Sequence, residues 1–403
     1  MAVIVQKYGG SSVADIERLQ RVADKVVATR RAGHDVVVTV SAMGKSTDNL
    51  LSLAREASAR EGQGSSPARR ELDMLVSTGE RVSMALLAIA IEARGEQAIS
   101  FTGSQSGIIT NDRHFDARII EVRPHRIEDE LARGRIVIVA GYQGMSYRRE
   151  ITTLGRGGSD TTAVALAAAL GAERCEIYSD VDGVYSADPR AVPDAQHLPE
   201  VDPGVLQEMA EAGAKVLNAQ AVAWARQAKI AIHARSTADR WEHPGAQAPR
   251  QTIVRENERT GVRAIVAETN LVLGHLPGSA LATLDRVSEV ATAREIPLKD
   301  ISVTADGGTL VIPLLNVPDW AKARSALGEA APDLRLREGL AAVSVVGDGL
   351  STTGRPLVDF LAALRQAEVV PVAVQATALR LTALIDPTGS VAAQRALHAR
   401  FVA

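Results

Sequence analysis

The sequence predicts an α/β protein with a mostly parallel sheet, followed by a smaller α+β region. The first observation is that short β-branched runs alternate with longer helical patterns up to about residue 235. Because these runs lack in-and-out alternation, they are typical of strands buried on both faces and joined by right-handed crossovers. The second observation is that the units become shorter beyond residue 252 and follow a β-α-β-β-α-β order.

The expected elements follow from these patterns. In the first part, strands are expected at 3–5, 36–40, 98–101, 136–140, 176–178 and 230–234. The helices between them include 16–31, 70–94, 161–170 and 214–227. In the second part we expect one βαββαβ unit over 262–338, with its first strand at 262–267, and another over 342–399, a weak repeat of roughly 80 residues. The boundaries are therefore 1–238, a linker at 239–260, and 261–403.

The composition excludes several classes of protein. The chain has 403 residues, of which 46% are hydrophobic, and its 45 Lys and Arg against 48 Asp and Glu leave a net charge of −3. Without a basic excess and with only 3% aromatic residues, we expect no nucleic-acid partner. A single cysteine, Cys175, fits a reducing compartment. The longest apolar run, 163–170, is short of the roughly 20 residues of a membrane span, so we expect a cytoplasmic protein.

The N-terminal run Lys7-Tyr8-Gly9-Gly10-Ser11-Ser12 follows the first expected strand and opens a helix. Its two glycines let the backbone approach a ligand, and the helix N-terminus offers N–H groups to anions. Lys7 adds a positive charge, which suits phosphate oxygens. The alternative interpretation is an ordinary strand-to-helix turn with a solvated lysine.

The most informative stretch is 153–162, in which three glycines, Arg156 and Ser159 precede an apolar helix. The pattern indicates an anion-binding loop at a helix N-terminus, where Arg156 can bind a carboxylate through two hydrogen bonds. Asp160 can act as a plain helix cap, but a cap requires neither the arginine nor the glycines. The acidic turn 179–190 follows another strand, at the edge where nucleotides bind in open α/β sheets.

Two other patterns only resemble known motifs, and a third motif is absent. Residues 41–46 imitate the end of a Walker A loop, but Thr39 stands where the first glycine belongs. Residues 103–107 imitate a nucleophile elbow, but the central residue is Gln105. The eight histidines lack zinc-site spacing, so no residue is assigned as a metal ligand.

Together, the motifs resemble those of the aspartate kinases of the amino-acid kinase superfamily. The matching segments occur in the family's order, at 7–13, 41–44, 77–81, 101–103, 153–162 and 179–190. The resemblance implies an eight-stranded α/β/α sandwich as the catalytic domain, here 1–238. It also implies transfer of the ATP γ-phosphoryl group, with Mg²⁺, to the side-chain carboxylate of L-aspartate, the first step towards lysine, threonine and methionine. A carboxylate nucleophile is already ionised, which explains why no histidine base stands out.

The resemblance also implies roles for individual residues. Lys7 stabilises the transferring phosphoryl group and Asp160 organises Lys7. Aspartate is bound by Ser41, Thr47, Glu80, Arg156, Gly157, Gly158 and Ser159. Glu80 either pairs with the amino group of aspartate or orients Lys7. ATP is bound by Lys7, Gly9, Gly10, Ser11, Ser179, Asp180, Tyr185, Arg190 and Lys215. Where the family often has His-Pro, this chain has Asn218-Ala219, a change from which we infer no loss of activity.

Residues 261–403 resemble the paired ACT domains through which aspartate kinases bind end-product amino acids and dimerise, so we expect a homodimer. The segments 295–302 and 375–380 depart from the family's effector-contacting turn and strand. Because a buried amino-acid site needs polar partners, we expect weak feedback inhibition, which would suit a specialised pathway. Two alternatives stay open: a kinase for another amino acid or carboxylate, and a non-catalytic amino-acid sensor.

Overall fold

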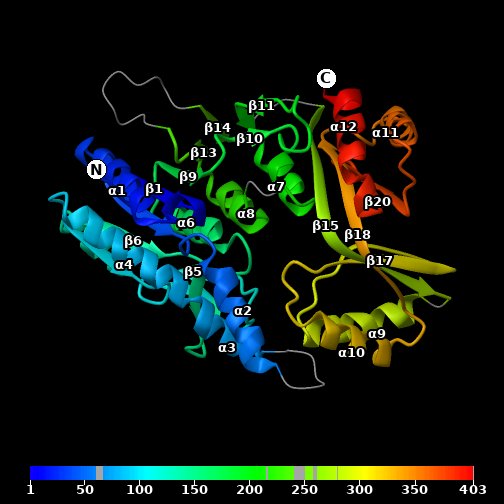
Figure 1. Ribbon diagram of the computed structural model, residues 1–403, viewed down its shortest axis with the longest axis horizontal. Coiled ribbons are helices and arrows are strands. Elements are labelled where there is room, and N and C mark those ends of the chain that lie inside the picture. Colours follow the sequence, from blue (N-terminus) through cyan, green and yellow to red (C-terminus); the bar gives the residue numbers. More distant parts are fainter. Residues whose placement is uncertain (60–66, 215–216, 240–249, 257–260, 279, 403) are drawn as a thin grey trace. The chain divides into compact units, whose positions relative to one another are not determined.

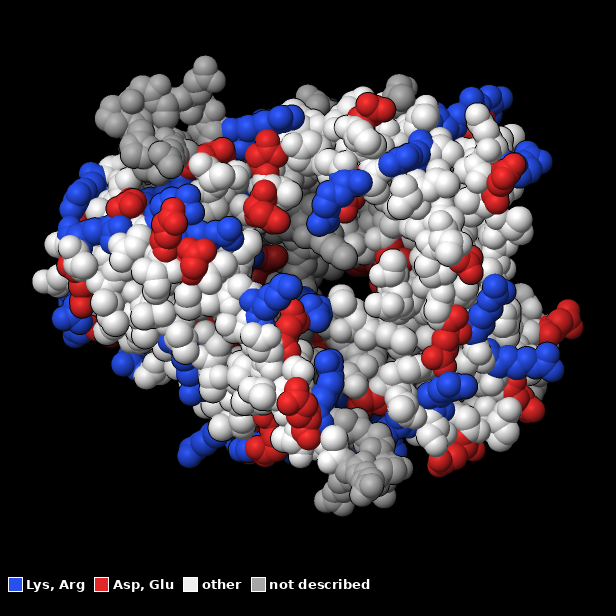
Figure 2. Space-filling view, in the orientation of Figure 1, with Lys and Arg blue, Asp and Glu red and all other residues white. Residues whose placement is uncertain are grey.

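The computed structural model describes residues 1–59, 67–214, 217–239, 250–256, 261–278 and 280–402. The chain divides into two compact units (Figure 1). Unit 1 comprises Met1–Val184, His197–Gln207 and Lys215–Glu258. Unit 2 comprises Tyr185–Gln196, Glu208–Ala214 and Arg259–Ala403. On the face shown in Figure 2, cationic and anionic side chains are interspersed, as a net charge of −3 would suggest.

Unit 1 is built on an eight-stranded sheet with the order β12-β14-β13-β9-β1-β2-β6-β3. The strands are β1 (Val3–Tyr8), β2 (Asp35–Val40), β3 (Ala98–Phe101), β6 (Ile136–Ala140), β9 (Arg174–Ser179), β12 (Glu200–Val201), β13 (Ile232–Ser236) and β14 (Gln251–Val254). The pairs from β13 to β3 are parallel, and only the β13–β14 pair is antiparallel. The mostly parallel sheet expected from the sequence is therefore confirmed.

Helices cover both faces of this sheet. Tyr8 of β1 packs with Leu19 of α1 (Ile16–Arg31) and Leu87 of α4 (Thr78–Glu92). Alternate residues of a strand point to opposite faces, so Lys7 points the other way. There it meets Asp160 of α6 (Gly158–Ala169), which packs beside α8 (Ala219–Ala228). The result is the predicted three-layer α/β/α arrangement.

Helix α1 has the ends that its sequence predicts. The Asp15 carboxylate accepts a hydrogen bond from the Arg18 backbone N–H at 2.8 Å and thereby caps the first turn. Arg30 and Arg31 lie in the last turn, where positive charge complements the helix dipole. Local signals therefore suffice to place this helix.

The helix expected over 70–94 is divided at Ser77 into α3 (Arg69–Val76) and α4. By length and composition, Arg69–Glu92 would be long and apolar enough to cross a membrane. Half of its apolar window is buried within the protein, and core helices of soluble proteins meet the same criterion. Since α4 packs on β3 and β6, we interpret it as a core helix.

A second, four-stranded sheet in unit 1 was not expected. Its order is β5-β4-β7-β8, and its strands are β4 (Ile108–Thr110), β5 (Ile119–Val122), β7 (Gln143–Ser146) and β8 (Ile151–Thr153). The unit also contains η1 (Gly10–Val13), α2 (Ser46–Ser58) and α5 (His125–Ala132). Strand β8 leads directly into the loop that carries Arg156, so this small sheet positions a candidate site residue.

Unit 2 contains a six-stranded antiparallel sheet with the order β16-β17-β15-β18-β20-β19. Its elements are β15 (Val262–Pro277), α9 (Ala280–Ala293), β16 (Lys299–Thr304), β17 (Gly307–Pro313), α10 (Trp320–Ala330), β18 (Arg335–Gly347), α11 (Arg355–Gln366), β19 (Ala373–Ala376), β20 (Arg380–Ile385) and α12 (Ser390–Phe401). Helix α7 (Pro203–Glu211) spans the division between the units. These elements are consistent with two ACT-like βαββαβ units.

The two ACT-like units are not simply consecutive in the chain. The first half of β15 pairs with the second half of β18, next to β20, whereas the second half of β15 pairs with β17. One βαββαβ unit is therefore inserted into the other. Asn270, with φ of 61°, lies at a register shift that lets β15 continue beyond 267, where the sequence suggested an end.

The segment expected as a linker, 239–260, also has a structural role. Residues 251–254 form β14, which adds an antiparallel strand to the main sheet. Residues 240–249 and 257–260 lie outside the described residues.

Candidate active site

The centre of the candidate site is a buried ion pair at the carboxyl ends of the parallel strands. Lys7, the second-last residue of β1, lies 2.6 Å from the Asp160 carboxylate, measured from Nζ to Oδ1. The two side chains are only 11% and 10% exposed. A lysine this buried requires an anionic partner, and Asp160 in the first turn of α6 provides it. Asp160 therefore fixes the position of the Lys7 ammonium group at the carboxyl end of β1.

Two loops touch beside this ion pair. The Gly44 N–H donates a hydrogen bond to the Gly10 carbonyl oxygen at 3.0 Å. A Cβ at Gly10 would lie 2.8 Å from the Ala42 carbonyl oxygen, so a larger residue would separate the loops. The same loop brings Gly9 next to Lys7, with a hypothetical Cβ 3.4 Å from Nζ. Gly10 is thus required by the close approach of the two backbones, whereas a Cβ at Gly9 would make only an ordinary van der Waals contact with Lys7.

Glu80 enters the site from the first turn of α4. One carboxylate oxygen accepts a hydrogen bond from the Ala42 N–H at 3.1 Å, while Oε2 is buried and has no hydrogen-bond partner among the described residues. Burial raises the pKa of Glu80 to about 7. Ser41 precedes this contact, its N–H donating to the Tyr8 carbonyl, and Thr47 lies in the first turn of α2. A buried carboxylate with spare acceptor capacity suits a cationic ligand group.

The loop between β8 and α6 carries Arg156. Gly157 adopts a left-handed conformation with φ of 79° at the start of α6, and a Cβ there would lie 3.1 Å from the Asn218 side chain. The Arg156 side chain is 60% exposed and lies 3.5 Å from the Asp48 carboxylate. Such an exposed pair contributes little to stability, so the guanidinium can exchange its partner for a ligand carboxylate.

Gly158 and Ser159 complete this loop at the N-terminus of α6. Both residues are buried, and a Cβ at Gly141 would lie 2.7 Å from Ser159 Oγ. The absence of a side chain at 141 therefore leaves room for the serine hydroxyl beside the strand ends. The structure thus brings Lys7, Asp160, Ser159 and Gly158 together around the start of one helix.

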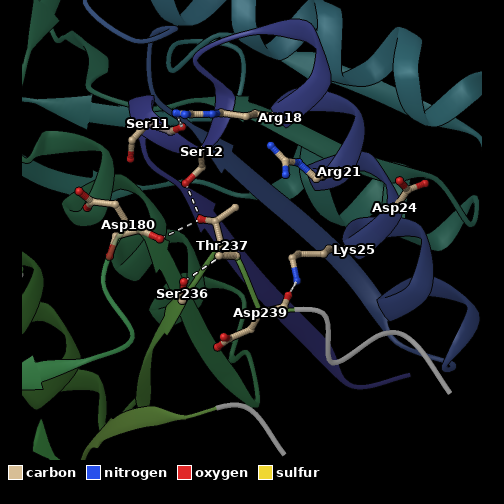
Figure 3. Close-up of a pocket in the computed structure, with 12 residues that line it drawn as sticks. Ser11, Ser12, Arg18, Arg21, Asp24, Lys25, Asp180, Ser236, Thr237 and Asp239 are labelled. Atoms are coloured by element: carbon tan, nitrogen blue, oxygen red, sulfur yellow. Dashed lines mark hydrogen bonds between the residues drawn. The ribbon is translucent and has the colours of Figure 1, made fainter. Parts of the chain in front are cut away.

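The N-terminal loop and the turn after β9 line a pocket of about 700 Å³ (Figure 3). Ser11, Ser179 and Asp180, all expected near ATP, contribute to its wall. The opposite wall is formed by α1 with Arg18, Arg21 and Lys25. The volume is within the range of small-molecule sites.

Three expected ATP residues, Tyr185, Arg190 and Lys215, lie outside unit 1 or outside the described residues. Tyr185 and Arg190 belong to unit 2, where the Arg190 guanidinium pairs with the Asp188 carboxylate at 2.8 Å. Lys215 lies outside the described residues. Among the described residues, no group of three or more His, Cys, Asp or Glu could hold a metal ion.

Sequence reasoning missed several residues that support the site. Asn218 caps α8 by accepting the Gln220 N–H, and its amide group donates to the Arg156 carbonyl at 2.9 Å. The buried Asp73 carboxylate contacts the partly exposed His114 ring at 2.6 Å. The Asn218 position was noted only as a departure from a motif, and nothing in the sequence links Asp73 to His114, which lies 41 residues away.

The comparisons with known proteins agree with this geometry. The amino acid kinase family profile matches residues 2–236. An aspartokinase from Mycolicibacterium smegmatis is 43% identical over 413 residues, covering 100% of this chain and 96% of the relative. Aspartokinase 2 of Bacillus subtilis is 37% identical over 409 residues, with coverages of 100% and 98%. The chain therefore belongs to the amino acid kinase family and, within it, to the aspartokinases.

A solved structure is similar to this chain in both fold and sequence. The crystal structure of E. coli aspartokinase III in complex with aspartate and ADP, described as the R-state, has a TM-score of 0.85 and 25% sequence identity. The match covers 99% of each chain.

Proposed function

We propose that this protein is an aspartate kinase that transfers the γ-phosphoryl group of ATP to the side-chain carboxylate of L-aspartate. The observation that carries the proposal is the buried Lys7–Asp160 pair at the strand ends, beside the anion-binding loop of Arg156. The relatives and the E. coli enzyme crystallised with aspartate and ADP support it.

The chemistry requires charge compensation rather than a base. The side chain of free aspartate has an ordinary pKa of about 3.9, so it is an anion at neutral pH and needs no deprotonation. The barrier is the repulsion between this carboxylate and the triphosphate. We propose that Lys7 faces the transferring group and that Asp160 fixes the lysine in place, so that the charge is preorganised for the transition state.

The substrate is oriented by a second set of groups. We propose that Arg156 binds a carboxylate of aspartate through two hydrogen bonds, supported by Ser159 and the Gly157–Gly158 backbone. The buried Glu80 carboxylate binds the α-ammonium group, and Ser41 and Thr47 border the ligand. These opposed charges recognise an amino acid and hold the reacting carboxylate in line.

ATP is assigned to the N-terminal loop and the turn after β9. That Ser11, Ser179 and Asp180 share one pocket supports this assignment, and we propose that the backbone of Gly9 and Gly10 contacts the phosphates. We propose that Mg²⁺ arrives with ATP, because phosphate oxygens are ligands that this ion prefers, and that it would neutralise part of the triphosphate charge. Tyr185, Arg190 and Lys215 remain proposed nucleotide residues.

The decisive experiment is a coupled ADP-release assay with Mg·ATP across aspartate, glutamate and related acids. We expect turnover with aspartate and at least about 100-fold lower kcat/KM with glutamate, whose extra methylene moves the reacting oxygen out of line. Equal turnover of both acids would contradict strict aspartate specificity, and nucleotide binding without turnover would indicate a sensor.

We further propose that unit 2 mediates dimerisation. Strands β16 and β19 form the two edges of its sheet, and Ile301 and Val374 on them are 47% and 37% exposed. Exposed apolar edges are usually covered in soluble proteins. Light scattering at the concentration of the assay is expected to give a dimer mass, and a monomer mass would contradict this proposal.

Weak feedback inhibition is the regulatory part of the proposal. The residues that depart from the family pattern bond to one another: Arg380 binds the Asp300 carboxylate at 2.6 Å, and the Gln375 amide donates to the Asp300 carbonyl at 3.2 Å. These polar groups are therefore already satisfied. Lysine plus threonine at about 10 mM, well above ordinary KM values, is expected to leave most of the activity. Strong inhibition would refute this expectation.

The cellular location is proposed on chemical grounds. ATP and aspartate are cytoplasmic metabolites, and the one cysteine, Cys175, is buried and needs no oxidising environment. We therefore expect the enzyme in the cytoplasmic fraction of cells, which fractionation with an activity assay would check.

A further inference from the structure

Asp73 is a buried carboxylate of α3 that the proposed chemistry does not use. It has no exposed surface, and its two oxygens accept three hydrogen bonds. His114 Nδ1 lies 2.6 Å from Oδ2, while the Thr153 hydroxyl donates to Oδ1 at 2.5 Å and the Phe115 N–H donates to Oδ1 at 3.0 Å. One carboxylate thus connects α3, the loop before β5 and the end of β8.

The backbone around Asp73 is held in a conformation that its residues disfavour. Phe115 has φ of 69°, in the left-handed region that bulky residues avoid. Tyr142, whose carbonyl accepts the Leu154 N–H, has φ of 67°. Strained residues persist when the surrounding contacts fix them, and they cluster at functional sites. The Asp73 contact to the Phe115 N–H is one such fixing contact.

Thr153 connects this cluster to the loop of Arg156. Its hydroxyl is bound to Asp73, and its carbonyl accepts the Ala117 N–H at 2.8 Å. The next residue, Leu154, donates its N–H to the Tyr142 carbonyl at 2.9 Å. The chain is therefore anchored on both sides at residues 153 and 154, and Arg156 follows two residues later.

We propose that Asp73, together with His114, is a positioning residue of the aspartate subsite, which it orients by fixing Thr153 and hence the loop that presents Arg156. The proposal rests on the assignment of Arg156 to aspartate binding. Neither Asp73 nor His114 touches substrate. They limit the orientations of the Arg156 guanidinium. Loss of either residue should therefore change the KM for aspartate rather than the KM for ATP.

The contacts of Asp73 also make this positioning sensitive to pH. Burial raises the pKa of Asp73 to about 6, while the hydrogen bonds from Thr153 and His114 lower it. Above this pH the carboxylate is ionised and accepts all three hydrogen bonds, and as the pH falls through about 6 it takes up a proton and loses acceptor capacity. The KM for aspartate should therefore rise on the acid side.

Other charged groups surround the cluster. On α3, Arg70 pairs with Glu71 at 2.8 Å and with Glu150, and in the loop Arg113 lies 3.3 Å from Asp116. On the side of the active site, Glu80 and Arg156 act electrostatically on Tyr142, as Asp73 itself does. Of these groups, Glu80 titrates nearby, at about 7, and it does not contact His114.

The test compares His114→Ala with His114→Asn, whose amide can replace Nδ1 as a donor, and with His125→Asn as a control. His125 is a surface histidine of α5, 84% exposed, that pairs with Glu128. At pH 7.5, His114→Ala is expected to raise the KM for aspartate about fivefold, with kcat and the KM for ATP within about twofold of wild type. His114→Asn is expected to restore most of the affinity, and His125→Asn to change nothing.

The pH profile separates positioning from a merely structural effect. Because His114 lowers the pKa of Asp73, its removal should shift the acid rise in the KM for aspartate to higher pH. The contribution of Glu80 is common to both enzymes, so the difference between the two profiles reports Asp73. Thr153→Val should reproduce the shift, and Thr153→Ser should behave like wild type.

Two results would overturn the inference: an unchanged KM for aspartate in His114→Ala, or equal losses in kcat and both KM values with no shift of the profile. Failure of the positioning role can be distinguished from failure of the proposed kinase function. If wild type phosphorylates aspartate and Arg156→Ala raises the KM, while His114→Ala does not, only the positioning role is wrong.

Discussion

The strand ends of unit 1 and the sheet of unit 2 differ in how completely some of their charged side chains are paired. In unit 1, Glu80 keeps one oxygen without a partner among the described residues, and Arg156 has a long, exposed contact with Asp48. In unit 2, Arg380 is bound to Asp300, and Lys299 is bound to Glu268. Unsatisfied buried charge is unfavourable unless a ligand completes it. The difference indicates where a charged substrate is expected and where one is not.

The largest effect is expected for Lys7, because its charge acts on the transition state. Lys7→Ala should lower kcat at least about 100-fold, or about 2.7 kcal/mol. The matched control is Lys322→Ala, an exposed lysine of α10 in unit 2, which should stay within about twofold of wild type. Steady-state kinetics measure both variants. A nearly unchanged kcat in Lys7→Ala would contradict the assignment of the reaction to the strand ends of unit 1.

The next effect concerns Arg156, whose proposed role is binding rather than chemistry. Arg156→Ala should raise the KM for aspartate at least about 20-fold, and Arg156→Lys should recover only part of this because an ammonium group lacks the two-pronged geometry. The control is Arg148→Ala, an exposed arginine that pairs with Asp112 at 3.1 Å. Similar KM values for Arg156→Ala and Arg148→Ala would contradict the assignment.

Replacing Glu80 is expected to make the protein more stable and its substrate binding weaker. Its folded-state pKa of about 7 lies above the usual value of 4.5 because of burial. Between pH 4.5 and about 7, Glu80 therefore takes up a proton when the protein folds. Its contribution to stability falls as the pH rises through this range. At pH 8, Glu80→Gln should increase the free energy of unfolding by about 1–3 kcal/mol.

The same substitution should weaken the enzyme. The ionised carboxylate is proposed to bind the substrate ammonium, so the KM for aspartate in wild type should rise as the pH falls through about 7. Glu80→Gln should raise the KM at pH 8 about tenfold and remove this dependence. Denaturant unfolding and pH-dependent kinetics measure the two effects, and a variant that is both less stable and equally active would refute the account.

The smallest effect on catalysis is expected in unit 2. Arg380→Met removes the guanidinium bound to Asp300 and should lower the free energy of unfolding by about 1–3 kcal/mol, because it leaves a carboxylate that is only 14% exposed without its partner. The kcat and both KM values should remain within about twofold of wild type. A large loss of kcat in this variant would show that the polar groups of unit 2 contribute to the reaction.

The sequence predicted those elements whose signals are local. Helix α1 has a capping aspartate and terminal arginines at its expected ends, and β3 and β6 have the expected bounds. The four-stranded sheet was missed because strands of three or four residues carry no clear alternation. Strand β15 was expected to end near 267, since the bulge at Asn270 that allows it to continue is set by pairing with β17 and β18.

The candidate site could be predicted as far as its residues lie in recognisable loops. The Lys7–Asp160 contact was expected from the resemblance to the aspartate kinases, and it joins two motifs at the carboxyl ends of the parallel strands. The Asp73 cluster could not be predicted, because its members lie 41 and 80 residues apart and each is an ordinary polar residue in its own segment. Asp73 is buried by contacts between segments that are distant in the sequence, and no local pattern indicates this.

The central claim is that a fixed positive charge at the strand ends promotes transfer of a phosphoryl group to the side-chain carboxylate of aspartate. Trapping the acyl phosphate with hydroxylamine, in the presence of Mg·ATP, tests this claim most directly. The wild-type protein is expected to yield the hydroxamate of aspartate in amounts equal to the ADP released, whereas Lys7→Ala yields almost none. Release of ADP without hydroxamate, or an equal yield from Lys7→Ala, would contradict the account.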